Sequence, residues 1–192
     1  MSTRHAYHLH VRFARRRKLL LGALALIVAG VVGYGLLHQS TPDERAGLTP
    51  DFKTYAPPAL AGSTLAGAKL SLADLRGKPT FLNFWQSYCG PCQDEARQLT
   101  SFTSTLEGRA NFVGVDVQDG RGAALAFIHK YAWSYPQLPV SDIELVQRFG
   151  VIGFPTTLVL DRRGTVVDKI VGPTTARALS LKLAAVDALS AA

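Results

Sequence analysis

The chain has only two cysteines in 192 residues, Cys89 and Cys92, which is too few for a disulfide-stabilised scaffold. Histidine is also sparse, and of the five present only His38 and His129 lie outside the first ten residues. A structural zinc site needs about four ligands, so we expect neither a metal ion nor another cofactor. Because no cysteine precedes Cys89, a lipoprotein signal is excluded.

Acidic residues are absent from residues 1–37, which carry six lysines and arginines. Residues 38–192 carry fifteen basic residues against fourteen acidic ones, so the net charge of +7 divides into +6 and +1. The globular part is therefore nearly neutral and has no basic stripe. The pI of 9.7 comes from the N-terminal arm, and we expect no nucleic-acid partner.

A long apolar run directly follows this basic arm. Leu19 to Leu37 are nineteen residues without a formal charge, and at about 1.5 Å per residue they would span roughly 28 Å as a helix. This predicts a single transmembrane helix, with residues 1–18 in the cytoplasm and the domain that follows exported. The alternative is a cleaved signal peptide, but no Ala-x-Ala site follows Leu37, which favours a retained anchor.

The rest of the chain divides into a polar tether and one domain. Residues 38–50 are polar with proline and glycine, as is typical of a tether, and residues 51–192 are long enough for one core. Within the domain, predicted strands alternate with predicted helices, which indicates an α/β sandwich. The expected elements are a β-hairpin (52–72), a helical turn (72–76), a strand (79–85), a helix (89–107), a strand (110–117), two helices (123–131 and 143–149), two strands (156–160 and 165–171) and a final helix (174–188).

The two cysteines stand where the predicted strand 79–85 passes into the next helix. Residues three apart lie on the same side of a first helical turn, so Cys89 and Cys92 can form a small disulfide ring. Free N–H groups at the helix start would lower the pKa of Cys89 from about 8.5 for a free thiol. We therefore expect Cys89 to be the nucleophile and Cys92 to resolve the mixed disulfide. A purely structural disulfide is the alternative, but so small a loop adds little stability.

Four motifs together resemble a known family. They are Leu75-Arg-Gly-Lys-Pro79, Phe81-Leu-Asn-Phe-Trp85, Cys89-Gly-Pro-Cys92 and Gly150-Val-Ile-Gly-Phe-Pro-Thr156. Over residues 50–190 the chain resembles the thioredoxin fold and, more narrowly, the membrane-anchored TlpA/ResA-type thiol-disulfide oxidoreductases. The resemblance implies an α/β thioredoxin-like sandwich with an N-terminal β-hairpin extension, preceded by a single transmembrane helix. Residues 118–141 look like the insertion of this family.

The resemblance also implies an activity and partners. It predicts an extracytoplasmic protein-disulfide reductase that acts on exported proteins, for example in cytochrome c maturation, and receives electrons from an integral membrane thiol donor. An oxidase role stays open. Two alternatives remain, a binding or chaperone-like module that uses the cysteines little, and a copper-delivery protein. Copper carriers of this fold have a longer cysteine spacing and a matched histidine, so His129 would have to approach the pair.

Several residues around the cysteines receive roles from the resemblance. Pro155 corresponds to the family's cis-proline, which would leave the backbone of Phe154 free to pair with an extended partner chain. A trans proline in an ordinary turn is the alternative. Tyr88 stands where tryptophan is usual, and Trp85 is expected to pack near the site. We take these four residues as candidate substrate-binding positions.

Glu95 follows Cys92 by three residues, so it should share the same helix face. In ResA-like proteins a glutamate here is a functional acid near the cysteines, and burial would raise its pKa toward neutrality. The alternative is a solvated glutamate on the helix surface. Asn83 stands where cytoplasmic thioredoxins have a buried aspartate, which places the resemblance closer to the exported subfamily.

Overall fold

The computed structural model describes residues 47–189. The predicted cytoplasmic arm (1–18), the predicted membrane anchor (19–37) and all but the end of the predicted tether (38–50) lie outside the described residues. Between residues 47 and 189, no helix is both long and apolar enough to cross a membrane.

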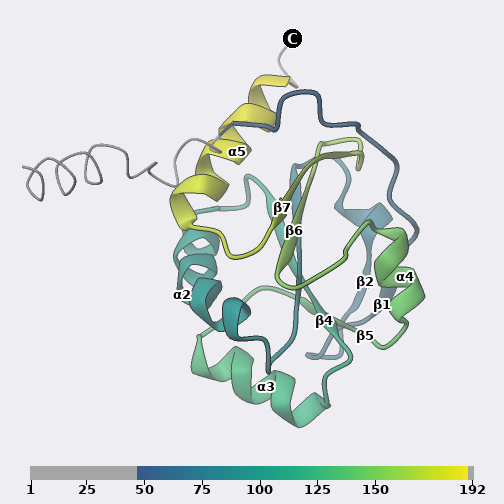
Figure 1. The fold of residues 1–192 in the computed structure, drawn as a ribbon, viewed down its shortest axis with the longest axis vertical. Helices are drawn as coiled ribbons and strands as arrows, with labels where there is room; N and C mark the ends of the chain where they lie inside the picture. The colour runs from purple at the N-terminus through teal and green to yellow at the C-terminus, as the bar shows by residue number, and fades with distance from the viewer. Residues whose placement is uncertain (1–46, 190–192) are drawn as a thin grey trace, which may run out of the picture. The chain divides into compact units, whose positions relative to one another are not determined.

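A five-stranded mixed sheet in the order β5-β4-β3-β6-β7 forms the centre of the domain (Figure 1). β4 runs parallel to both β3 and β5, whereas β6 is antiparallel to both β3 and β7. All six residues of the central strand β3 are buried, as expected for a strand covered on both faces. The strands are β3 (Thr80–Trp85), β4 (Asn111–Val117), β5 (Gln137–Val140), β6 (Thr156–Leu160) and β7 (Val166–Val171).

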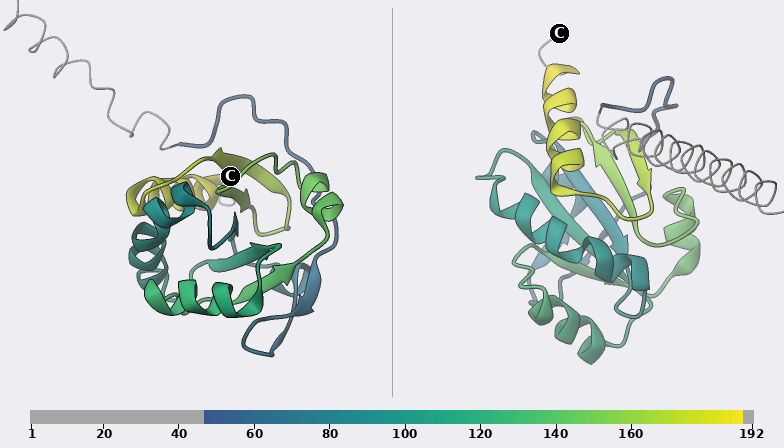
Figure 2. Two further views of the ribbon diagram at one scale, coloured as in Figure 1. Left: turned by 60° about the horizontal axis from the view of Figure 1, so that its bottom comes forward. Right: turned by 60° about the vertical axis from the view of Figure 1, so that its left-hand side comes forward.

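Helices cover both faces of the sheet (Figure 2). Side chains alternate along β3, so Phe81 and Trp85 pack in one core with residues of α2, α3 and α5. Leu82 and Phe84 point to the opposite face and pack in a second core with Val146 of α4. The helices are α2 (Gly90–Ser104), α3 (Arg121–Lys130), α4 (Ile143–Arg148) and α5 (Ala176–Leu189).

The predicted N-terminal hairpin is present but shorter than residues 52–72. It consists of β1 (Ala61–Ser63) paired antiparallel with β2 (Lys69–Ser71), followed by the 3-10 helix η2 (Leu72–Leu75). The preceding chain instead makes one bridge, between Tyr55 and Val166. Two consecutive prolines, at positions 57 and 58, separate this bridge from β1 because proline has no N–H for a strand ladder.

One strand of the sheet was not predicted. β5 lies inside the segment 118–141 that was interpreted as an insertion, and it pairs with β4 from Gly114↔Gln137 to Val117↔Val140. The prolines in Tyr135-Pro-Gln-Leu-Pro139 obscured the strand pattern. They are tolerated because β5 is at the edge of the sheet, where a missing N–H breaks no ladder on the outer side.

A buried ion pair between β7 and α5 also binds residues 47–49, which precede the hairpin. Lys182 of α5 donates through Nζ to Oδ2 of Asp168 on β7 at 2.5 Å and to the carbonyl of Gly47 at 3.0 Å. The backbone N–H and Oγ1 of Thr49 also donate to Asp168, at 3.2 and 2.7 Å. Asp168 and Lys182 are 0% and 3% exposed. Residues 47–49 are therefore held against the last strand and the last helix.

Candidate redox active site

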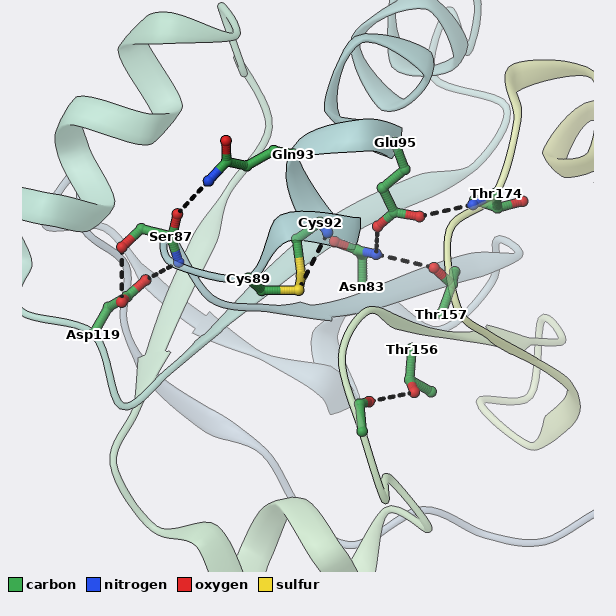
Figure 3. The surroundings of a disulfide bond; sticks show 11 residues. Asn83, Ser87, Cys89, Cys92, Gln93, Glu95, Asp119, Thr156, Thr157 and Thr174 are labelled. Carbon is green, nitrogen blue, oxygen red and sulfur yellow. Dashed lines mark hydrogen bonds between the residues drawn. A yellow bond between two sulfur atoms is a disulfide. The ribbon is translucent and has the colours of Figure 1, made fainter.

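Cys89 and Cys92 form a disulfide at the junction of β3 and α2 (Figure 3). Cys89 is the N-cap residue of α2 and Cys92 lies in its first turn, with their Cα atoms 5.2 Å apart. Pro91 suits this first turn because it has no N–H to leave unpaired. The backbone N–H of Cys92 donates to Sγ of Cys89 at 3.2 Å. This contact, together with the helix N-terminus, would stabilise a thiolate on Cys89.

The two sulfur-bearing residues differ in their access to solvent. Cys92 is 0% exposed and packs in the core, whereas Cys89 is partly exposed. Only Cys89 can therefore be approached from outside. Disulfide exchange requires attack by an accessible thiolate, so this asymmetry fits the order in which Cys89 reacts first and Cys92 second.

Glu95 lies one turn further along α2 and is almost completely buried, with 1% of its surface exposed. Its Oε1 accepts a hydrogen bond from Nδ2 of Asn83 at 2.8 Å, and its Oε2 accepts one from the backbone N–H of Thr174 at 3.0 Å. Burial raises the pKa of Glu95 to about 7, although both hydrogen bonds oppose the shift. The alternative of a solvated glutamate is wrong, and this carboxyl can exchange a proton near neutral pH.

Asn83 connects Glu95 to the sheet. Its Nδ2 also donates to Oγ1 of Thr157 on β6, at 3.0 Å, so one amide group joins α2, β3 and β6 (Figure 3). Its Oδ1 is buried and has no hydrogen-bond partner among the described residues. The amide stays neutral at every pH, whereas an aspartate here would add a second carboxyl next to Glu95.

Replacing Glu95 with glutamine is expected to remove a pH dependence of stability. The folded protein holds the proton of Glu95 up to a pKa of about 7, against 4.5 in the unfolded chain. The folded state therefore binds more protons between these values, and its stability is greatest below them and falls as the pH rises. Relative to Glu95→Gln, wild type should lose about 3 kcal/mol of unfolding free energy between about pH 4 and pH 8.

The measurement is urea unfolding of the two oxidised proteins across this pH range. Other groups titrate in both proteins, so the difference between them isolates Glu95. A difference that does not change with pH would show that this carboxyl keeps its ordinary pKa.

Pro155 lies at the same end of the sheet as the cysteines. The Phe154–Pro155 peptide bond is cis, so the alternative of a trans proline is wrong. Thr156, the first residue of β6, pairs with Phe84 near the end of β3, and Cys89 follows just beyond that end. Phe154 is partly exposed. The antiparallel register of β3 and β6 therefore brings two segments far apart in sequence to the same end of the sheet.

A sequence model of the AhpC/TSA family matches residues 49–169, which contain the cysteine pair and Pro155. The chain belongs to the AhpC/TSA family. It is 28% identical over 163 residues to the thiol-disulfide oxidoreductase ResA of Bacillus thuringiensis subsp. konkukian, covering 84% of this chain and 91% of that protein. It is also 28% identical over 175 residues to the thioredoxin-like protein YneN of Bacillus subtilis, covering 87% of this chain and 97% of the relative.

A solved structure supports the same assignment. The thiol:disulfide interchange protein of the thioredoxin family from Chlorobium tepidum TLS superposes with a TM-score of 0.63 at 26% identity, over 71% of this chain and 99% of that chain. These findings confirm the thioredoxin-like fold and the resemblance to ResA-type proteins. Within the AhpC/TSA family, the chain is a thiol-disulfide oxidoreductase.

Tyr88 and Trp85, both considered as substrate contacts, have opposite environments in this AhpC/TSA-family protein. Tyr88, directly before Cys89, is 66% exposed and is available to a partner. Trp85 is 0% exposed, and its Nε1 donates to Oε1 of Gln137 at 2.9 Å. It packs on Phe127 and Trp133 with ring centroids 4.7 and 4.9 Å away. The prediction that Trp85 contacts the substrate directly is therefore wrong, because its side chain lies on the face of β3 that packs into the core.

Ile152 was not considered from the sequence. It lies three residues before Pro155 and is 88% exposed, which is unusual for so large an apolar side chain. The feature that could have indicated an exposed loop here is the position of Ile152 between two glycines, Gly150 and Gly153.

No group of three or more histidine, cysteine, aspartate or glutamate side chains within residues 47–189 could hold a metal ion. His129 lies in the last turn of α3. The copper-delivery alternative would need it to join the two cysteines.

Proposed function

We propose that the protein is an extracytoplasmic thiol-disulfide oxidoreductase that reduces disulfides of exported proteins. The observation that carries the proposal is the cysteine pair itself, with an accessible Cys89 at a helix start and Cys92 buried behind it. A structural disulfide would not need one sulfur open to solvent. The names of the relatives agree with this chemistry.

In the proposed reaction, the Cys89 thiolate attacks one sulfur of the client disulfide. A mixed disulfide forms and the first client sulfur leaves as a thiolate. The Cys92 thiolate then attacks the Cys89 sulfur and displaces the second client thiolate. The client gains two electrons and becomes a dithiol after taking up two protons, and the protein is left with the Cys89–Cys92 disulfide.

Glu95 would serve the second step. Cys92 must lose its proton before it can attack, and its side chain is 0% exposed, so bulk solvent is a poor proton acceptor for it. The pKa of Glu95, about 7, allows this carboxyl to accept a proton at neutral pH and return it later. Its place one turn after Cys92 on the same helix supports this assignment.

The client would bind beside Pro155. Exposed apolar side chains at Tyr88 and Ile152 and the partly exposed Phe154 support an extended, partly apolar segment as the ligand. Apocytochrome c is a candidate client, on the resemblance alone.

Each turnover leaves the protein oxidised, so an electron donor is needed in an exported compartment. We propose an integral membrane thiol protein for this role. The basic arm and the apolar run at residues 19–37 support anchoring in the same membrane, with the N-terminus in the cytoplasm.

The reduction potential of the Cys89–Cys92 couple tests the proposal and its direction. The full-length protein is equilibrated in dithiothreitol and glutathione buffers, and its thiols are trapped and counted. A reductase should have a potential below that of the glutathione pool, which is about −200 mV in secretory compartments. A higher value would make the protein an oxidase or isomerase, and a pair that cannot be cycled reversibly would overturn the redox function.

A further inference from the structure

A second carboxylate lies next to the turn that carries Cys89. Asp119, in the loop after β4, accepts two hydrogen bonds from Ser87, which precedes Cys89 by two residues (Figure 3). The backbone N–H of Ser87 donates to Oδ2 at 2.6 Å, and its Oγ donates to Oδ1 at 2.9 Å. Both donors of Ser87 are thus satisfied by one side chain from another loop.

Asp119 is in turn held by Asp116, near the end of β4. Asp116 is 1% exposed, its side chain hydrogen-bonds that of Asp119, and its Oδ1 has no partner among the described residues. Two carboxyl groups can share a hydrogen bond only if one of them carries a proton. Burial first, and then Asp119, raise the pKa of Asp116 to about 8, so at neutral pH Asp116 carries the shared proton and donates it to the carboxyl of Asp119.

The same turn is held from the other side by α2. Nε2 of Gln93 donates to the carbonyl of Ser87 at 3.3 Å, and the N–H of Cys89 donates to the carbonyl of Gln86 at 3.2 Å. The turn from β3 into α2 therefore has restraints from its own helix and from the β4–α3 loop.

Asp94 and Arg97 on α2 are exposed to solvent, whereas Glu95 and Arg121 are engaged elsewhere. Glu95 on α2 is bonded to Asn83 and Thr174. Arg121 at the start of α3 donates to the carbonyl of Leu65 at 2.8 Å. The remaining charges on α3, at His129 and Lys130, are in its last turn. Among the described residues, Asp119 is the ionisable group that raises the pKa of Asp116.

We propose that Asp119 is a positioning residue that holds Cys89 at the start of α2 through Ser87, and that Asp116 donates the hydrogen bond that holds Asp119. The proposal rests on the proposed function only in that Cys89 is the nucleophile. With the turn held, Sγ of Cys89 stays within reach of the Cys92 N–H that stabilises its thiolate. A carboxylate acting only as a nearby charge would do the opposite and raise the pKa of Cys89.

Positioning by Asp119 and a purely electrostatic effect of its charge therefore predict opposite changes in the alkylation rate of Cys89 when Asp119 is removed. In full-length protein carrying Cys92→Ala, Cys89 is the sole thiol, and its rate of alkylation by iodoacetamide reports its thiolate. We expect Asp119→Ala to slow alkylation at pH 7 by about fivefold, the effect of losing the one hydrogen bond from the backbone N–H at position 92 to Sγ of Cys89. A faster or unchanged rate would overturn the proposal. If Asp119→Ala does not fold, Ser87→Ala removes one of the two bonds and should slow alkylation less.

The Asp116 variants separate positioning from general loss of structure. Asp116→Asn keeps a neutral donor at every pH. At pH 7, Cys89 should therefore be alkylated at the same rate in the Asp116→Asn variant as in the protein that keeps the original aspartate. When Asp116 is present, it loses its proton above about pH 8. Alkylation of Cys89 should then be slower than titration of the Cys89 thiol alone predicts. Asp116→Asn should lack that break, and Asp116→Ala should resemble Asp119→Ala at pH 7. A break that persists in Asp116→Asn would overturn the role of Asp116. No disulfide substrate is involved, so a negative result leaves the proposed function untouched.

Discussion

Replacement of Cys89 with serine is expected to abolish disulfide reduction, with a loss on the order of a thousandfold or more. A serine hydroxyl is almost fully protonated at neutral pH and cannot form a mixed disulfide. Of the two cysteines, Cys89 is also the one that a client can reach, since Cys92 is 0% exposed. The measurement is the dithiothreitol-driven reduction of insulin disulfides by full-length protein.

Cys92→Ser provides the matched control. It keeps the accessible thiolate, so the first attack on a client disulfide should still occur. The mixed disulfide cannot then be resolved, and a covalent complex should accumulate that is visible on a non-reducing gel and is absent for Cys89→Ser. Full activity in Cys89→Ser would instead identify a binding module that does not use its cysteines for chemistry.

Replacement of Lys182 with methionine is expected to lower the free energy of unfolding by about 3 to 5 kcal/mol. The substitution keeps the volume of the side chain but leaves Asp168, which is 0% exposed, without its cationic partner. A buried carboxylate without a cationic partner is costly because its desolvation is no longer offset by a nearby charge. Urea unfolding of the oxidised protein should show a lower midpoint with an unchanged slope.

An exposed ion pair in the same domain provides the comparison. Arg162 and Asp187 are 2.9 Å apart, with side chains 46% and 37% exposed. Arg162→Met should therefore lower stability by no more than about 1 kcal/mol. If both variants lose the same free energy of unfolding, burial does not explain the contribution of the Lys182–Asp168 pair to stability. The held segment at residues 47–49 should also become sensitive to proteolysis in Lys182→Met, because Lys182 donates to the carbonyl of Gly47.

Short-range chemistry explains which predictions from the sequence were correct. The spacing of Cys89 and Cys92 after an apolar strand was enough to place both at the start of a helix, because a strand and a helix each follow from local periodicity. The cis Phe154–Pro155 bond followed from the resemblance. The edge strand β5 was missed because Pro139 breaks a local strand pattern and only pairing with β4 makes the segment a strand.

Burial and pairing between distant segments were decided by the tertiary structure alone. Trp85 and Tyr88 are three residues apart and were both taken as candidate contacts, yet one is 0% and the other 66% exposed. The pairing of Asp119 with Ser87 joins residues 32 positions apart, which no local pattern reveals.

The amino-acid sequence by itself determined the redox pair, its order in the helix and the alternation of strands and helices. The fold decided which acids are buried and what they touch. A pKa depends on desolvation and on neighbours that reach a group from other elements, as Asn83 and Thr174 reach Glu95. The chemistry of Cys89 and Cys92 is therefore encoded locally, whereas its tuning depends on contacts that exist only after the chain has folded.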